Sequence, residues 1–107
     1  MNTRRKPNER PKWLNPDNTY DLLHPITWTQ GESPQVTSRL NLRRLTAADM
    51  LILDEALPYT EKLLRIIEGM TGQLRAVTIR LDSVDMDRID DIFGYFREPG
   101  QATGATS

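Results

Sequence analysis

The sequence predicts an α+β fold in which an N-terminal β-hairpin packs on a small bundle of three to four short helices. Apolar residues alternate with polar ones over 24–43 and then recur every third or fourth residue from Thr46 onward, a change from strand to helix periodicity. Proline, glycine and polar residues dominate both ends. We therefore expect one folded domain over 19–97, between a disordered basic arm (1–18) and a flexible tail (98–107).

The composition limits the classes of function. The chain has 107 residues, a net charge of −1 and no cysteine. The charge argues against a generally basic nucleic-acid binder, and the absence of cysteine excludes disulfides, thiolate metal sites and thiol catalysis. The N-terminus is charged, and no apolar run approaches the length that crosses a bilayer. We expect a protein that is not exported and does not contact the membrane.

The first element is an expected hairpin. In "HPITWTQG", Ile26 and Trp28 fall on one face, and in "VTSRLNLR" Val36, Leu40 and Leu42 share a face. The intervening "TQGESP" has the glycine and proline of a connection, so an antiparallel pair is the simplest interpretation. A lone hairpin is marginal in water, and its apolar face must therefore lie on the helices that follow.

Two helices are expected next. Thr46 is a good N-cap, and Asp49 can complete a variant of the capping box, with Pro58 ending this helix. Thr60 can cap a second helix, and Gly72 is placed as a left-handed C-terminal cap.

The last third contains an ambiguous segment and a final helix. Residues 74–80 include the β-branched Val77, Thr78 and Ile79, which suit a strand, but Leu74, Val77 and Leu81 have helical spacing, and we favour a helix or helical turn. Asp82 or Ser83 can cap the final helix.

No catalytic motif is present, and we expect neither an enzyme, nor a metal, nor a cofactor. His24 is the single histidine. Asp82, Asp85 and Asp87 loosely resemble a calcium loop but lack its glycine and terminal glutamate. Carboxylates near the start of a helix have a simpler explanation, because they favour the positive end of its dipole.

Two sets of residues remain as candidates for contacts. The first is the basic arm, which can contact nucleic acid or an acidic partner or stay solvated; its cations are Arg4, Arg5, Lys6, Arg10 and Lys12. The second is an apolar set that so small a domain has little volume to bury, and which we expect to line in part a groove for a partner helix. Its members are Met50, Leu53, Leu57, Leu64, Ile67, Ile92, Phe93 and Phe96.

The order of these motifs resembles a known family. The segments "LNLRRLTAADMLILDE", "TEKLLRIIEGMTG" and "VTIRLDSVDMDRIDDIFGYF" are similar to the tail assembly chaperones of long-tailed bacteriophages, of the Mu-like and P2-like type. The resemblance covers 37–96. Its matching positions are Leu42, Arg43, Arg44, Thr46, Asp49, Thr71, Gly72, Leu81, Asp82, Asp85 and Phe96.

The resemblance implies a non-enzymatic role in the host cytoplasm. Such proteins bind apolar helical segments of the tape measure protein and keep it soluble while the tail tube polymerises around it. It also implies absence from the mature virion. Contact with the tail tube protein and self-association into a homo-oligomer stay open.

Two other classes fit parts of the sequence. A ribbon-helix-helix DNA-binding regulator has a similar order of strand and helices, although it does not need the preceding hairpin partner. A structural tail or head-tail completion protein of the virion would use the arm to wrap a neighbouring subunit. Salt-sensitive DNA binding marks the first alternative, and presence in purified virions marks the second.

Overall fold

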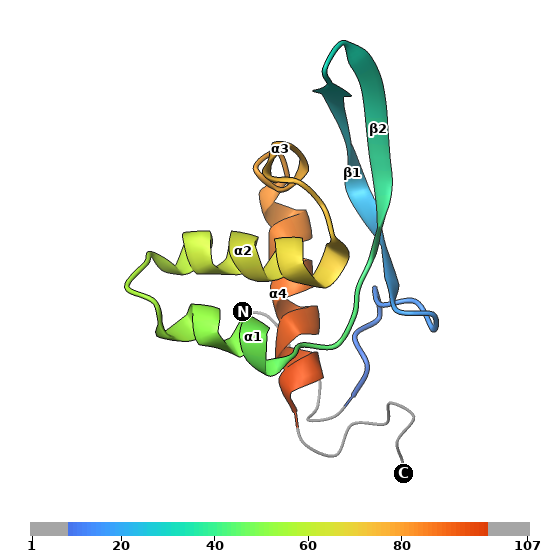
Figure 1. The fold of residues 1–107 in the computed structure, drawn as a ribbon. Helices are drawn as coiled ribbons and strands as arrows, with labels where there is room; N and C mark the ends of the chain where they lie inside the picture. The colour runs from blue at the N-terminus through green and yellow to red at the C-terminus, as the bar shows by residue number, and fades with distance from the viewer. Residues whose placement is uncertain (1–8, 99–107) are drawn as a thin grey trace.

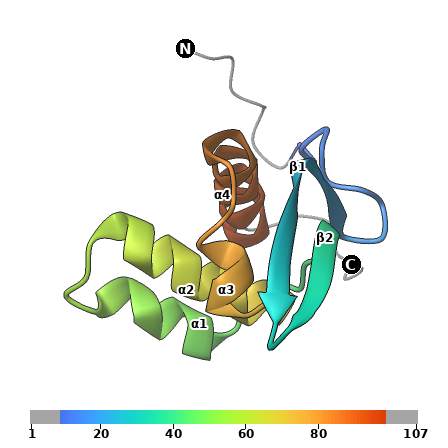
Figure 2. The same ribbon diagram turned by 90° about the horizontal axis from the view of Figure 1, so that it is seen from above.

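A computed structural model describes residues 9–98 and shows an α+β fold, which confirms the predicted class. A two-stranded antiparallel hairpin precedes the helices, which lie beside β1 in both views (Figures 1 and 2). In chain order the elements are β1 (Thr19–Gln30), β2 (Ser33–Asn41), α1 (Ala47–Leu51), the 3-10 helix η1 (Ile52–Asp54), α2 (Tyr59–Thr71), α3 (Arg75–Thr78) and α4 (Ser83–Arg97).

A tight turn joins the two strands. Gln30 pairs with Ser33, so the connection consists of Gly31 and Glu32. Gly31 has φ 64°, a left-handed value that glycine adopts without a steric penalty. Glycine with positive φ at the first central position is typical of a type II′ turn, whose twist matches that of the flanking strands.

A bulge interrupts the pairing in the middle of the hairpin. Asp21 lies opposite Arg39, but the next pair is Ile26 with Thr37, so residues 22–25 bulge out of the ladder. The bulge supplies the extra length that makes β1 longer than β2.

The bulge also decides which side chains of the outer half of the hairpin are buried. Thr27 lies opposite Val36, and paired residues share a face, so Val36 is on the opposite face from Ile26. Ile26, Leu40 and Leu42 are buried, whereas Val36 is 69% exposed. The expectation that Val36 is buried with Leu40 and Leu42 is therefore wrong.

A buried carboxylate fixes this bulge to the helices. Asp85, in the first turn of α4, has 0% relative exposure. It accepts hydrogen bonds from the Tyr20 hydroxyl and from the backbone N–H groups of Leu23 (2.9 Å) and His24 (3.1 Å). Burial, together with the bond to Asp85, raises the pKa of Tyr20 well above its ordinary value. The bulge thus has an acceptor for N–H groups that the ladder leaves unpaired.

One hydrophobic core joins the hairpin to α2, α3 and α4. Aromatic and branched side chains from all four parts of the chain contribute to it, so no element is stable by its own contacts alone. Its buried members are Leu14, Tyr20, Leu22, Ile26, Leu40, Leu42, Leu63, Ile66, Ile67, Met70, Val77, Ile89, Ile92, Phe93, Tyr95 and Phe96.

The start of α1 is locked against α2. Thr46 and Asp49 form the predicted capping box. Arg43 donates two hydrogen bonds to the Asp49 carboxylate, at 2.7 and 3.1 Å, and these hold the pKa of Asp49 below its ordinary value. A Cβ on Gly69 of α2 would lie 2.8 Å from Asp49 Oδ1, so only glycine lets the two helices approach this closely.

The other helix ends follow the sequence with two exceptions, the start of α2 and the end of the first helix, which lies at Leu51, followed by η1, and not at Pro58. Gly72 has φ 75° and ends α2, and Asp82 accepts from Val84 N to cap α4, as predicted. The helical interpretation of 74–80 is confirmed by α3 and the turn after it. The cap of α2 was wrongly assigned to Thr60: the helix begins at Tyr59, and Pro58 is its N-cap.

The folded part begins earlier than residue 19. Leu14 belongs to the core, and Arg10 donates to the carbonyl of Leu14 (3.3 Å) and to Asn18 Oδ1 (2.8 Å). The Arg88 guanidinium lies 4.8 Å from the centroid of the Trp13 ring. Residues 10–18 therefore pack on the domain, which corrects the predicted boundary of the arm. Arg4, Arg5 and Lys6 and nearly all of the predicted tail lie outside the described residues.

We predict that Asp85→Ala lowers the free energy of unfolding by about 2–4 kcal/mol, because it leaves buried donors of the bulge and Tyr20 without an acceptor. Asp87→Ala, at an exposed position of the same helix, should change it by no more than about 0.5 kcal/mol. Urea unfolding followed by circular dichroism measures both. Equal stability of the two variants would contradict the role given to Asp85.

Candidate partner-binding surface

The structure divides the predicted apolar set into two groups. Five members are buried and have no surface to offer a partner, which corrects the expectation that they line an open groove; these are Leu64, Ile67, Ile92, Phe93 and Phe96. The other three, Met50, Leu53 and Leu57, are partly exposed and lie close together in the sequence. The sequence analysis overestimated the exposed apolar surface of the domain. Most apolar side chains of α2 and α4 are buried in the core that these helices share with the hairpin.

Those three residues mark a larger apolar segment, residues 50–59, which we call the elbow. It runs from the end of α1 through η1 to the start of α2 and forms the outer end of this helical pair (Figures 1 and 2). None of its residues is buried, although Ile52 and Leu53 pack in part on the core. Leu51 is 65% exposed and Tyr59 is 53% exposed. Its large apolar side chains are Met50, Leu51, Ile52, Leu53, Leu57 and Tyr59.

Polar contacts hold the elbow in one conformation. Lys62 Nζ donates to the Leu53 carbonyl at 2.8 Å, and the Tyr59 hydroxyl donates to Asp90 Oδ1 of α4 at 2.7 Å. Burial and the bond to Asp90 raise the pKa of Tyr59 to about 12. A surface that is ordered before binding loses less conformational entropy when a partner arrives.

The sequence analysis identified three of the six large apolar residues of the elbow, namely Met50, Leu53 and Leu57. It missed Leu51, Ile52 and Tyr59, because helical periodicity over 46–57 assigns Leu51 and Ile52 to the polar side of a continuous helix. The structure has no such helix: α1 ends at Leu51 and η1 replaces its last turn. The helix-breaking residue of this segment, Pro58, lies seven residues beyond Leu51 and therefore does not mark where α1 ends.

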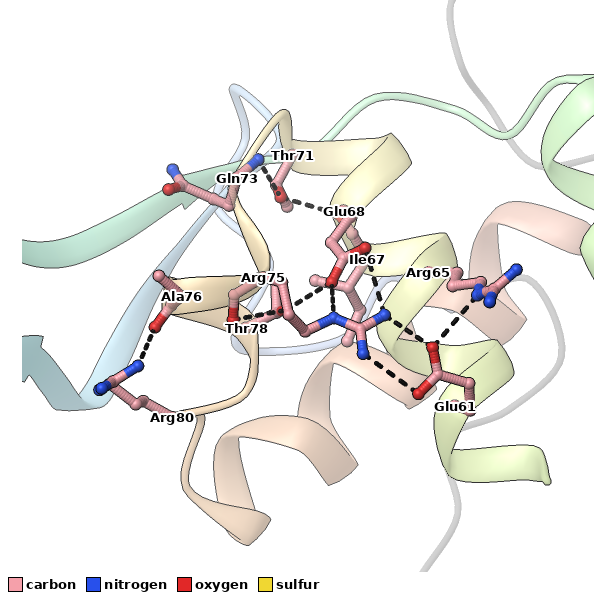
Figure 3. A network of polar contacts seen from close by, with 10 residues as sticks. All are labelled: Glu61, Arg65, Ile67, Glu68, Thr71, Gln73, Arg75, Ala76, Thr78 and Arg80. Carbon is pink, nitrogen blue, oxygen red and sulfur yellow. Dashed lines mark hydrogen bonds and ion pairs between the residues drawn. The ribbon is translucent and has the colours of Figure 1, made fainter. Parts of the chain in front are cut away.

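The polar clusters of the domain connect its elements. Arg75 of α3 donates to Glu61 of α2 at 3.1 and 2.7 Å and also to Glu68, and Thr78 donates to Glu68 at 2.7 Å (Figure 3). Hydrogen bonds from Arg75 and then Arg65 lower the pKa of Glu61 to about 2. These carboxylates are held in ion pairs that fasten α3 to α2.

The remaining candidate residues are dispersed or engaged. Asp82 caps α4 and Asp85 is buried in the bulge contact, so the three aspartates of the loose calcium pattern do not converge. Within 9–98 no group of three histidine, aspartate or glutamate side chains could hold a metal ion. In the basic arm, Arg10 is bound to backbone carbonyls and Lys12 is exposed.

Comparisons with known proteins found no match. No protein-family model, no curated protein and no solved structure matches the chain. In the part of the chain that the structure describes, none of the helices combines the length and the apolar character of a membrane span.

We predict opposite effects of aspartate at an elbow position and at a core position. Leu51→Asp should leave the melting temperature within a few degrees of the wild type, since about two thirds of this side chain is already in water. Phe93→Asp should abolish cooperative unfolding, because it buries an unpaired charge. A large loss of stability in Leu51→Asp would show that the elbow is structural.

We also predict an acid-sensitive contribution from Glu61. Its pKa is about 2 in the folded protein and near 4.5 when unpaired, so its ion pair stabilises the fold fully above pH 4.5, and the contribution is lost as the pH falls toward 2. Glu61→Gln should therefore melt below the wild type at pH 7, and the difference should disappear near pH 2. Thermal unfolding across this range checks the prediction, and a constant difference would contradict it.

Proposed function

We propose that this protein is a tail assembly chaperone of a long-tailed bacteriophage, which binds the tape measure protein in the host cytoplasm and keeps it soluble for polymerisation of the tail tube. The observation that carries the proposal is the elbow, a segment of the folded domain that carries six large apolar side chains and in which no residue is buried. The order of motifs over 37–96 supports the same family.

The exposed apolar area suits reversible binding. Burying one large apolar side chain is worth roughly 1.5–3 kcal/mol, and association loses several kcal/mol of translational and rotational freedom. Leu51 and Tyr59, with partial contributions from Met50, Leu53 and Leu57, therefore support a modest affinity. A chaperone that must leave as tube subunits arrive needs contacts of this strength.

The elbow favours a helical partner. Its backbone groups are largely used within the chain: Glu55 N–H bonds the Ile52 carbonyl, Leu57 N–H bonds Glu55, and Lys62 bonds Leu53. The elbow thus offers side chains and few backbone donors or acceptors. A partner that buries an apolar face here must satisfy its own backbone, and a helix does so internally. This agrees with the apolar helical segments expected of a tape measure protein.

The alternatives receive less support. A ribbon-helix-helix regulator is expected to have a strand directly followed by two full helices, whereas here the strand belongs to a hairpin and α1 has five residues. A structural tail or head-tail completion protein would be recovered from purified virions, and the proposed chaperone would be absent from them.

We predict that co-expression with the tape measure protein, the very long helical protein encoded beside the tail tube, increases the soluble fraction of that partner and allows both to be purified together. Leu51→Asp should weaken the complex roughly 10- to 100-fold, the loss expected for one buried apolar side chain. Pull-down and titration calorimetry measure this effect.

A matched control uses Ile79→Asp, which places the same charge on an apolar position that is 57% exposed, directly after α3 and outside the elbow. This variant should still bind the tape measure protein. No effect of co-expression and no joint purification would refute the proposed function. Joint purification that Leu51→Asp does not weaken would retain the partner and refute the elbow as its site.

A further inference from the structure

The outer half of the hairpin, residues 26–37, is unusually free of charge and of cover. Its tip extends past α3, away from the helices (Figure 1). Between Pro25 and Ser38 the only charged residue is Glu32, which lies in the turn. Ile26 is buried and Trp28 packs in part on the core, whereas none of the other residues is buried.

The two edges of this half-hairpin differ in their surroundings. α3 and α4 contact β1, and α2 contacts β2, but the outer edge of β2 faces away from the helices in both views (Figures 1 and 2). Among the described residues the sheet has two strands, so no further strand pairs with the second side of β2. At the inner end Arg39 forms an ion pair with Asp21, at 2.6 Å, and this charged pair marks the limit of the uncharged edge.

The backbone of β2 presents hydrogen-bonding groups on this free edge. In an antiparallel pair, residues alternate between positions whose N–H and C=O groups face the partner strand and positions whose groups face outward. Counting from the two-residue turn, where Gln30 and Ser33 face each other, Val36 is an outward position. Pro34, the preceding outward position, has no N–H, so strand addition is restricted to the part around Val36.

Natural proteins usually protect such an edge with lysine, with inward-pointing charges or with covering elements. Here the single protective residue is Pro34. Val36 is 69% exposed, the highest value among the large apolar side chains of the described residues. An uncharged edge with an exposed β-branched residue at its centre is a template for another strand.

We propose that the β2 edge binds the β2 edge of a second copy of this chain, antiparallel across a twofold axis near Val36, so that two hairpins form one four-stranded sheet. The proposal is independent of the tape measure protein and adds a second surface to the elbow.

Charge and symmetry favour a second copy as the occupant. Residues 33–38 carry no charge, so identical edges meet without repulsion, and the antiparallel arrangement is self-complementary. Val36 shares its face with Thr27, so the joined sheet would have the row Thr27, Val36, Val36 and Thr27 across its four strands. Adjacent β-branched side chains stabilise a sheet, and each valine is then covered by its symmetry mate.

Sedimentation velocity of the purified full chain, without a partner, tests the proposal. The wild type should show a concentration-dependent monomer–dimer equilibrium. Val36→Lys should raise the dimer dissociation constant at least tenfold, because the twofold axis brings the two lysines together, while the circular dichroism spectrum stays unchanged and the melting temperature equals that of the wild type at concentrations where both are monomeric. Val36→Thr keeps the β branch and should retain the dimer.

The absence of cysteine permits a direct test of the geometry. Val36→Cys should form a covalent dimer upon mild oxidation, because residues near the axis of an antiparallel pair lie within disulfide reach. Glu32→Cys, at the turn, should not, since antiparallel pairing moves the two turns to opposite ends of the sheet.

The outcomes separate this proposal from the proposed function. Leu51→Asp should dimerise like the wild type, and Val36→Lys should still bind the tape measure protein. A wild type that is monomeric at every concentration, or a Val36→Lys variant that dimerises like the wild type, would overturn the proposal. Capture of a different protein by the edge of a monomeric chain would also overturn it.

Discussion

The position of the hairpin depends on the contact between the Asp85 carboxylate and the bulge of β1. A hairpin of two strands has little stability alone, and residues 22–25 leave the ladder just where the strand must meet the helices. By accepting from Tyr20 and from two N–H groups of the bulge, Asp85 converts an interruption of the sheet into its attachment to α4. The same bulge changes which side chains of the outer hairpin face the body of the protein, so it leaves Val36 in water. The contact of Asp85 with β1 and the exposure of Val36 on β2 are therefore both consequences of the bulge at residues 22–25.

The sequence was sufficient for features that depend on local chemistry. The capping box of Thr46 and Asp49, the left-handed Gly72 and the Asp82 cap are each determined by a few neighbouring residues, and all three were predicted correctly. The bulge was not predictable in the same way. Residues 22–26 do not alternate, and Pro25 within them is typical of a bulge or an edge strand, but nothing local shows that the Asp85 carboxylate, 62 and 61 residues after Leu23 and His24, accepts hydrogen bonds from their N–H groups.

The candidate site was predicted in part, for a related reason. Periodicity identifies side chains that must leave water, but it does not say whether they pack within the chain or against a partner. Ile67 and Ile92 lie at the meeting of α2, α4 and the hairpin, and their burial follows from long-range topology. Met50, Leu53 and Leu57 are partly exposed because α1 and η1 lead away from the hairpin to the outer end of the helical pair (Figure 1). The exposed apolar surface therefore depends on the end of α1 at Leu51, which the apolar periodicity of the sequence did not reveal.

The arrangement of the two surfaces gives them a joint consequence. The elbow and the β2 edge lie on opposite sides of the protein in both views (Figures 1 and 2). A dimer joined through β2 would therefore present one elbow at each outer end. A long helical client with repeated apolar segments could then occupy both elbows, and the second contact would form at a high effective concentration. Two weak sites would retain the client strongly, whereas an arriving tube subunit would need to displace only one modest contact at a time. Strong retention and stepwise release, which conflict in a monomer with one site, become compatible in such a dimer.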